Sequence, residues 1–487
     1  MRIVVLSALL LCASVASVIA QTPAPAPITI GDVVFSTTLR SRTYAWSWFG
    51  DTPEGNYTYQ GSQWRFGISE AKKRYDWQIE FEVPFFLNLP TTAVAAPPRG
   101  QLGLGGSYYA ANGNSENPAA LFLKQGFVRF KDLGGVPGQS LKIGRMEFND
   151  GLEVLPKNAT LATLKRERIS QRLLGNFGFS DVLRSQDGVQ YVYSNPKLNV
   201  TALAARPTEG VFQVNGWHEL NINVFYGAVT RQVGSERNPG EWRLFGLGYD
   251  DYRHGVLKTD NRSAAARTAD TGSVTLGTYG GHFLQVAATP AGPVDVLLWG
   301  AVQTGSWGAL TQRAGALTAE VGWQPTVLPA LKPWIRVGYD YTSGDSNSAD
   351  GNHGTFFQVL PTARVYARTP FFNMMNTADA FGELIVRPST RLTLRTDVHD
   401  LQLSDKNDLW YSGGGAFQPG TFGFNGRPSN GQSGLATLYD LSGDYTVNAH
   451  LVITPYYGYF HSQEVAHAIF PTSAGGHLGY VEFLIRF

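Results

Sequence analysis

Cysteine is almost absent from this chain of 487 residues, because Cys12 is the only one. It lies in a stretch that begins with the basic Met1-Arg2, continues as an apolar run and ends in small residues before Gln21. That pattern is typical of a secretory signal peptide, which we assign to residues 1–20. The mature chain therefore has no thiol, which excludes disulfides, zinc–thiolate sites and cysteine nucleophiles.

Long apolar runs are missing after the signal peptide. Mean hydropathy is −0.14, and no later stretch is long enough for a spanning helix, which excludes a helical membrane protein. An excess of one charge sign is missing too. The formal charge is +1, and removal of Arg2 with the signal peptide leaves 38 basic and 38 acidic residues. The basic residues are dispersed, so nucleic-acid binding is not expected.

Glycine and aromatic residues are abundant, with 55 Gly, 28 Phe, 22 Tyr and 11 Trp. Many segments alternate with the period of two expected of strands. In residues 480–487, Val481, Phe483 and Phe487 fall on one face and Glu482 on the other. In residues 75–84, a row of four apolar residues opposes a row that contains three carboxylates. The wall of a membrane barrel, with lipid outside and water inside, would suit both faces of these segments. The core of a soluble β-sandwich, in which both faces of a strand are buried, would not.

About 18 such segments follow a Pro/Ala-rich spacer at residues 21–31. We therefore predict an all-β fold: one transmembrane antiparallel β-barrel over residues 32–487, in a bacterial outer membrane. Asn88–Pro118 and Thr342–Phe372 are predicted to be long extracellular loops. A barrel of this size is wide enough for an aqueous channel. Taken singly, each segment also fits a strand of a secreted all-β lectin or hydrolase.

The most informative strand is residues 391–399, because strand parity places two arginines, a carboxylate and an imidazole on its lumen face. If the strands close into one barrel, five arginines point into a common pore, near Glu80, Asp340 and Asp397. An arginine-lined constriction would select anions, although the same arginines could simply brace the wall. The five predicted pore arginines are Arg65, Arg129, Arg336, Arg391 and Arg395.

Two motifs carry a family resemblance. The run Arg395-x-Asp397-x-His399, continued to Asp408-x-Trp410-Tyr411, resembles a segment of the alginate export family of outer-membrane proteins. The run Ser343-Gly344-Asp345, continued to Gly354-Thr355-Phe356 and Pro361-Thr362, is similar to another segment of that family. Gly144-Arg145 and Asp187-Gly188-Val189 match weaker family positions. Ala363-Arg364 departs from the pattern, which has a His after Pro-Thr.

The resemblance implies an 18-stranded monomeric barrel that conducts anionic polysaccharide outward through an arginine-lined lumen. By match to the family, Arg145, Asp187, Arg395 and Asp397 are the expected pore residues. Alginate itself is not assumed as the substrate. Binding partners would be outer-membrane lipid, the polysaccharide and a candidate periplasmic export scaffold.

The loop Thr342–Phe372 is predicted to gate the pore, with Asp345 and Asp350 as its acidic residues. Residues 343–351 loosely resemble a calcium-binding loop, but Ala349 stands where a ligand is needed. Weak calcium binding is left open there, and no other cofactor or metal is expected. No Gly-x-Ser-x-Gly or phosphate-binding motif occurs, so we do not expect an enzyme. The first alternative function is an uptake porin for small organic anions or oligosaccharides.

Overall fold

The computed structural model describes residues 25–49, 53–362, 368–472 and 474–487. The signal peptide assigned to residues 1–20, with Cys12, lies outside the described residues. So do residues 21–24 of the predicted spacer, whereas Ile28–Ile30 of that spacer form the short strand β1 and pair with β2. Among the described residues, no helix has the length and apolar character needed to cross a membrane.

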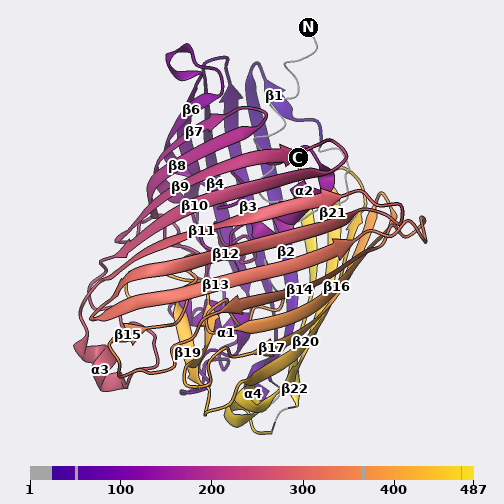
Figure 1. Ribbon diagram of the computed structural model, residues 1–487. Coiled ribbons are helices and arrows are strands. Elements are labelled where there is room, and N and C mark those ends of the chain that lie inside the picture. Colours follow the sequence, from indigo (N-terminus) through magenta and orange to yellow (C-terminus); the bar gives the residue numbers. More distant parts are fainter. Residues whose placement is uncertain (1–24, 50–52, 363–367, 473) are drawn as a thin grey trace.

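The strands build a closed antiparallel β-barrel of 18 strands, which confirms the predicted fold (Figure 1). Each wall strand pairs with its neighbour in sequence, and the last pairs with the first. The wall strands are β2 (Val33–Ser47), β3 (Asn56–Ala71), β4 (Tyr75–Leu87), β5 (Phe122–Lys131), β6 (Gln139–Met146), β7 (Gln186–Ser194), β8 (Leu198–Pro207), β9 (Ile222–Gly234), β10 (Pro239–Asp251), β11 (Val274–Ala287), β12 (Val294–Trp307), β13 (Leu310–Trp323), β14 (Trp334–Thr342), β16 (Ala378–Ser389), β17 (Leu392–Gln402), β20 (Gly434–Thr446), β21 (Leu451–Ser462) and β22 (Gly475–Arg486).

Shorter elements lie in the connections. They are the strands β15 (Asn352–His353), β18 (Leu409–Gly413) and β19 (Phe424–Pro428), the helices α1 (Gly103–Ala111), α2 (Ala159–Leu164), α3 (Ala264–Ala269) and α4 (Glu464–Ile469), the 3-10 turns η2 (Pro53–Gly55) and η3 (Leu133–Gly135), and the π-helical turn η4 (Lys165–Ile169).

Closure of the barrel rests on β2 and β22, which pair from Thr38↔Arg486 to Ser47↔His477. Beyond that ladder, Phe487 and Thr37 exchange two backbone hydrogen bonds of 2.9 and 3.3 Å. A closed ladder leaves no free strand edge, so every strand of the wall has a partner on both sides.

The two faces of the wall follow the predicted alternation. Val481 and Phe483 are 40% and 43% exposed on the outer face, whereas Glu482 between them is buried on the lumen side. Asp76, Gln78, Glu80 and Glu82 of β4 are likewise buried on the lumen side. The predicted row of three carboxylates therefore faces inward, as expected for an apolar outside and a polar inside.

The two ends of the barrel differ in the length of their connections. Most turns at the end where β2 begins and β22 ends are short, such as residues 72–74 and 195–197. The opposite end holds the long loops, among them residues 88–121 and 343–377, with α3 and α4 (Figure 1). In outer-membrane barrels the short turns are periplasmic and the long loops extracellular. Both predicted long loops thus lie at one end.

Candidate functional site

A single connection crosses the inside of the barrel. The residues between β6 and β7, numbers 147–185, form what we call the lumen segment, which contains α2 and η4. Asn158 caps α2 by accepting a hydrogen bond from the Leu161 backbone N–H, and Leu161 and Leu164 are buried. The sequence of this stretch has no strand period, although it holds the charged run Lys165-Arg166-Glu167-Arg168.

Charged residues of η4 and the turn after it bind the wall on several sides. These ion pairs are Lys165–Glu241 at 2.7 Å on β10, Arg168–Glu320 at 2.9 Å on β13, Arg172–Asp340 at 3.0 Å on β14 and Glu167–Arg395 at 2.9 Å on β17. Most of these side chains are almost fully buried. Removing one partner of a buried pair costs about 3–5 kcal/mol, so these contacts hold the segment in place.

The far end of the lumen segment binds the opposite wall. Asp181 accepts a hydrogen bond of 2.9 Å from the Tyr44 hydroxyl and lies 3.6 and 3.9 Å from the guanidinium groups of Arg40 and Arg42. The Leu183 backbone N–H donates to Glu82 at 3.0 Å. The segment therefore spans the lumen from β2 and β4 to β13 and β14.

Three of the predicted arginines lie on the lumen face, buried and paired. Arg65 contacts Glu80 and lies 3.2 Å from Glu147. Arg336 contacts Asp295 and lies 2.6 Å from Glu320. Arg395 lies 2.6 Å from Asp444, in addition to its contact with the lumen segment. In this arrangement they brace the wall, the alternative that the sequence left open.

Arg129 lies near the short-turn end of β5 and pairs with Asp76, with a 3.0 Å hydrogen bond from Nε. Its side chain is 29% exposed, more than those of the three buried arginines. Asp397 lies on the lumen face of β17 but forms no ion pair with Arg395 within the described residues. Asp397 therefore does not neutralise Arg395, which is bound instead by Asp444 on β20 and Glu167 in η4.

Arg391, Arg145 and Asp187 are not on the lumen face. Arg391 lies before β17, in an exposed turn at the barrel's rim. Arg145 and Asp187 are cross-strand neighbours joined by two hydrogen bonds of 2.6 and 2.7 Å. They share a face with Ile143 and Val189, which are exposed on the outside. These three pore assignments are corrected: the alternation that places Ile143 on the outer face continues through Arg145.

The predicted gating loop folds into the barrel. Leu360 pairs with the lumen segment through backbone hydrogen bonds of 2.8 Å to Leu173 and 3.0 Å from Gly175. Phe356 and Phe357 are buried inside. The loop's position matches the expectation of a segment placed in the pore mouth. Residues 363–367 of the loop, including the divergent Ala363-Arg364, lie outside the described residues.

The two acidic residues of this loop differ in exposure. Asp345 is buried and Asp350 is exposed. Each accepts a local backbone hydrogen bond, from Asn347 and Asn352 respectively. Within the described chain, neither belongs to a group of three carboxylate or imidazole ligands close enough to share an ion. The loop's contacts thus give weak calcium binding no support.

Asp408 lies in the extracellular loop between β17 and β20, residues 403–433, and binds that loop to the gating loop. Its carboxylate accepts hydrogen bonds of 2.9 Å from the Asp345 backbone N–H and 2.5 Å from the Thr355 hydroxyl, and one of 2.7 Å from the Tyr411 hydroxyl. We call this set of hydrogen bonds the clasp. Burial disfavours the charged carboxylate and raises the pKa of Asp408 to about 6. Burial also raises the pKa of Asp345.

We expect this clasp to tighten as the pH falls. The pKa of Asp408 is higher in the folded clasp than in an open loop, where it would be about 3.9, so the folded clasp binds the proton more strongly. Its stability should rise between pH 7 and pH 5. Amide hydrogen exchange, corrected for its intrinsic pH dependence, should give protection factors for residues 343–362 that are roughly tenfold larger at pH 5.

Asp408→Asn should remove most of this pH dependence and serves as the control. Equal protection at both pH values in the unmodified chain, or weaker protection at pH 5, would contradict the assignment of Asp408 as the titrating group.

A cavity of about 220 Å³ opens among the loops at the extracellular end. Its lining includes Trp48, Phe177, Phe212 and Phe417, together with Arg427. The guanidinium of Arg427 stacks over Trp48 and Trp410 at 5.5 and 4.8 Å. It donates to the backbone oxygens of residues 99 and 101, and no carboxylate in the described chain lies within ion-pair distance.

Comparisons with known proteins agree with this architecture. A family model for alginate export matches residues 105–468. No curated protein matches the chain. Solved structures that resemble it include OpdK with vanillate and OccK9 (OpdG), both from Pseudomonas aeruginosa, with TM-scores of 0.56 and 0.58 and identities of 10% and 11%. Each comparison covers 94% of this chain and 99% of the other.

A third structure, OccAB2 of Acinetobacter baumannii, has a TM-score of 0.55 and 9% identity, with 94% of this chain and 98% of the other covered. At such low identities, the three structures establish the barrel fold and say nothing of a shared substrate.

Proposed function

The chain belongs to the alginate export family, and we propose that this outer-membrane channel conducts an anionic polysaccharide outward. Family membership supports a polymer of sugar acids as the cargo. The proposal assigns no catalytic role and no cofactor, and it takes the barrel to work as a monomer that receives its polymer from a periplasmic export scaffold.

The observation that carries the proposal is the aromatic cavity around Arg427. Ligand sites combine apolar and aromatic walls with a few placed polar groups, as this cavity does. Arg427 has no carboxylate of the described chain beside it, and after its hydrogen bonds to the Ser412 hydroxyl and to the backbone oxygens, one N–H of Nη1 remains for a charge-assisted bond to a carboxylate. A sugar acid could place its ring against the aromatic side chains and its carboxylate near this arginine.

Conduction requires movement of the lumen segment, because that segment and the gating loop fill the barrel. Displacement of the segment would free Arg40, Arg42 and Arg395 from Asp181 and Glu167. These arginines could then exchange a protein carboxylate for the carboxylate of the passing polymer. We propose that the arginines brace the closed channel and bind anions in the open one.

Uptake of small organic anions is the second candidate function. The lumen segment and the gating loop occupy the lumen, so a path that opens beside them would be narrow. A narrow path suits a small carboxylate better than a polymer, which favours uptake of small anions. The similarly folded OpdK was solved with vanillate. The outer-membrane channel itself is common to both candidates.

Planar-bilayer recordings would separate the two. We expect oligouronates of several residues to block the current at lower concentration than vanillate. Arg427→Gln should raise the blocking concentration of the oligouronate roughly tenfold, because a hydrogen-bonded charge pair contributes about 1.5–3 kcal/mol. Arg206→Gln, at an exposed arginine on the outer wall, is the matched control and should change nothing.

Stronger block by vanillate than by oligouronate would favour uptake of small anions. Loss of the gene should trap uronate polymer in the periplasm if the direction is outward, and an unchanged polymer distribution would argue against export.

A further inference from the structure

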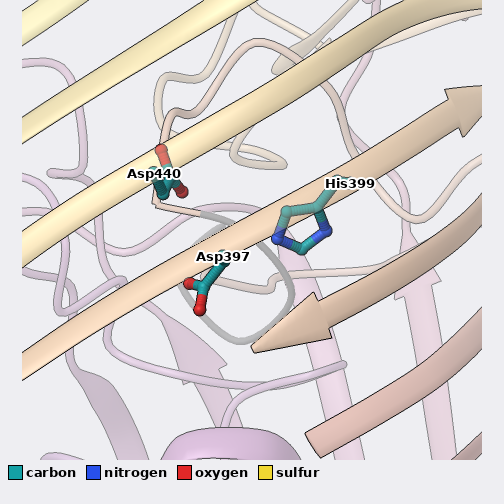
Figure 2. A group of neighbouring side chains, drawn as sticks. All are labelled: Asp397, His399 and Asp440. Atoms are coloured by element: carbon teal, nitrogen blue, oxygen red, sulfur yellow. The ribbon is translucent and has the colours of Figure 1, made fainter. Parts of the chain in front are cut away.

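Two carboxylates and an imidazole meet on the lumen face of the wall (Figure 2). Asp397 and Asp440 are direct partners across β17 and β20, and His399 lies two residues along β17 on the same face. One ligand atom from each of the three side chains falls within 4.8 Å of the others. Strand alternation fixes this grouping, because residues i and i+2 share a face.

The ring of His399 is held in one orientation. Its Nδ1 lies 2.9 and 3.1 Å from the two carboxylate oxygens of Asp379 on β16. The ring also stacks on Phe381, with 5.5 Å between the ring centres. The other ring nitrogen, Nε2, is turned toward Asp397 and Asp440 (Figure 2). A carboxylate on one imidazole nitrogen that leaves the other free is the arrangement that orients histidine ligands of metal ions.

The polar atoms that face this spot are incompletely satisfied. Oδ1 of Asp397 is buried and has no hydrogen-bond partner. His399 is 2% exposed, and within the described residues its Nε2 forms no hydrogen bond. A buried carboxylate oxygen without a donor is costly and calls for an explanation.

Negative charge is also in excess here. Glu383 is the direct partner of Asp397 on β16, so three neighbouring strands place carboxylates side by side. Among the nearby cations of the described chain, Arg336 lies 3.8 Å from Glu383 and Arg168 binds Glu320, while Arg368 acts on Asp397 and Asp440 through its charge without forming an ion pair. Arg395 binds Asp444 and Glu167, and the guanidinium of Arg368 donates to Ser442 at 2.6 Å. A cation would therefore be stabilised between Asp397 and Asp440.

We propose that Asp397, His399 and Asp440 bind a divalent transition-metal ion of the Zn²⁺ class, with Asp379 as the residue that positions His399. Imidazole nitrogen with carboxylate oxygen suits such ions better than Mg²⁺ or Ca²⁺. Bonds of about 2.0–2.2 Å require ligand atoms that lie nearer to one another than the 4.8 Å limit within which these fall, and small side-chain rotations can supply any difference. A fourth position would remain open to water.

The ion would join β17 to β20 and also reach the gating loop. Asp440 already accepts hydrogen bonds of 3.3 Å from the Arg368 backbone N–H and from the Thr369 hydroxyl. The competing account has no metal: a protonated His399 would serve as the cation for the surrounding carboxylates.

Cobalt binding separates the two accounts. The full-length protein in detergent, freed of metal by a chelator, would be titrated with Co²⁺ and followed by visible absorption, then with Zn²⁺ as competitor. We expect one equivalent of Co²⁺ to give bands that Zn²⁺ removes. Asp397→Asn should weaken binding at least 100-fold, and Asp379→Asn by about 10- to 100-fold.

His461→Gln, at an exposed histidine on the outer wall, is the matched control and should bind as the unmodified chain does. Asp397→Asn preserves the shape of the side chain, and heat-modifiable gel mobility would verify that this variant forms the barrel. His399→Gln is a second ligand variant, and Asp397→Asn decides the test if His399→Gln does not assemble. The proposal is overturned by the absence of saturable bands, by unchanged binding in Asp397→Asn, or by loss of binding in His461→Gln. None of these outcomes depends on what the channel conducts.

Discussion

Replacing Arg168 and Arg172 together by glutamine should open the channel. Both arginines anchor the lumen segment to Glu320 and Asp340, and all four side chains are largely buried. Without the arginines, Asp340 would be left buried without a cation and Glu320 with Arg336 alone, at about 3–5 kcal/mol for each broken pair. The segment should leave the lumen so that water reaches these groups. Single-channel conductance in bilayers should rise several-fold, since a barrel of 18 strands is wide enough for an aqueous pore.

Arg166→Gln is the matched control, because Arg166 lies in the same turn but is exposed and forms no ion pair with the described residues. It should leave conductance unchanged. An unchanged conductance in the double variant, with barrel assembly verified by heat-modifiable mobility, would show that the segment is held by its apolar contacts instead. Adding Glu320→Gln and Asp340→Asn to the double variant should restore part of the closure, since the uncompensated carboxylates are then gone.

Arg395→Glu should lower the preference for chloride over potassium. Arg395 is buried between Asp444 and Glu167 on the lumen face, and its reversal would bring three carboxylates together. Repulsion should push the lumen segment away from β17 and leave that wall negative. The substitution changes the charge at one site by two units. The reversal potential under a salt gradient should therefore shift toward cation selectivity, while barrel assembly remains intact.

The control is Arg391→Glu, four residues earlier in the chain, in an exposed turn at the rim. It changes the total charge equally and should have a much smaller effect, because solvent and salt screen exposed charges. Equal shifts in both variants would show that Arg395 acts only through total charge and is not a pore residue.

The barrel was predictable because its signal is local. A strand with lipid on one side and a polar lumen on the other must alternate, and residues 75–84 and 480–487 do so without interruption. Parity also gave the correct face for Arg65, Arg336 and Arg395.

The filling of the lumen was not predictable in the same way. The lumen segment has no strand period, and nothing local tells that Arg168 will meet Glu320, which lies 152 residues away. The partner of Arg395 could not be read from the sequence for the same reason: Asp444 is brought near by the register between β17 and β20. The available signals of a segment inside the lumen were the four charges at residues 165–168 and the length of the connection between β6 and β7. The pore assignment of Arg145 was wrong because it rested on the family match, whereas strand parity places Arg145 on the outer face with Ile143.

The outer wall sets how thick a bilayer this barrel fits. On β9 the outward residues run from Asn223, which belongs to a polar cluster with Arg206 and Asp250, through the exposed Phe225 and Val229 to Arg231. Eight residues at about 3.3 Å each make roughly 26 Å along the strand, and a tilt of about 35–45° reduces this to roughly 20 Å of height. The bacterial outer membrane is thinner than average, and this side of the barrel is matched to such a membrane. In vesicles of long-chain lipids the same polar residues would be drawn into hydrocarbon, so insertion should be fastest into short-chain bilayers.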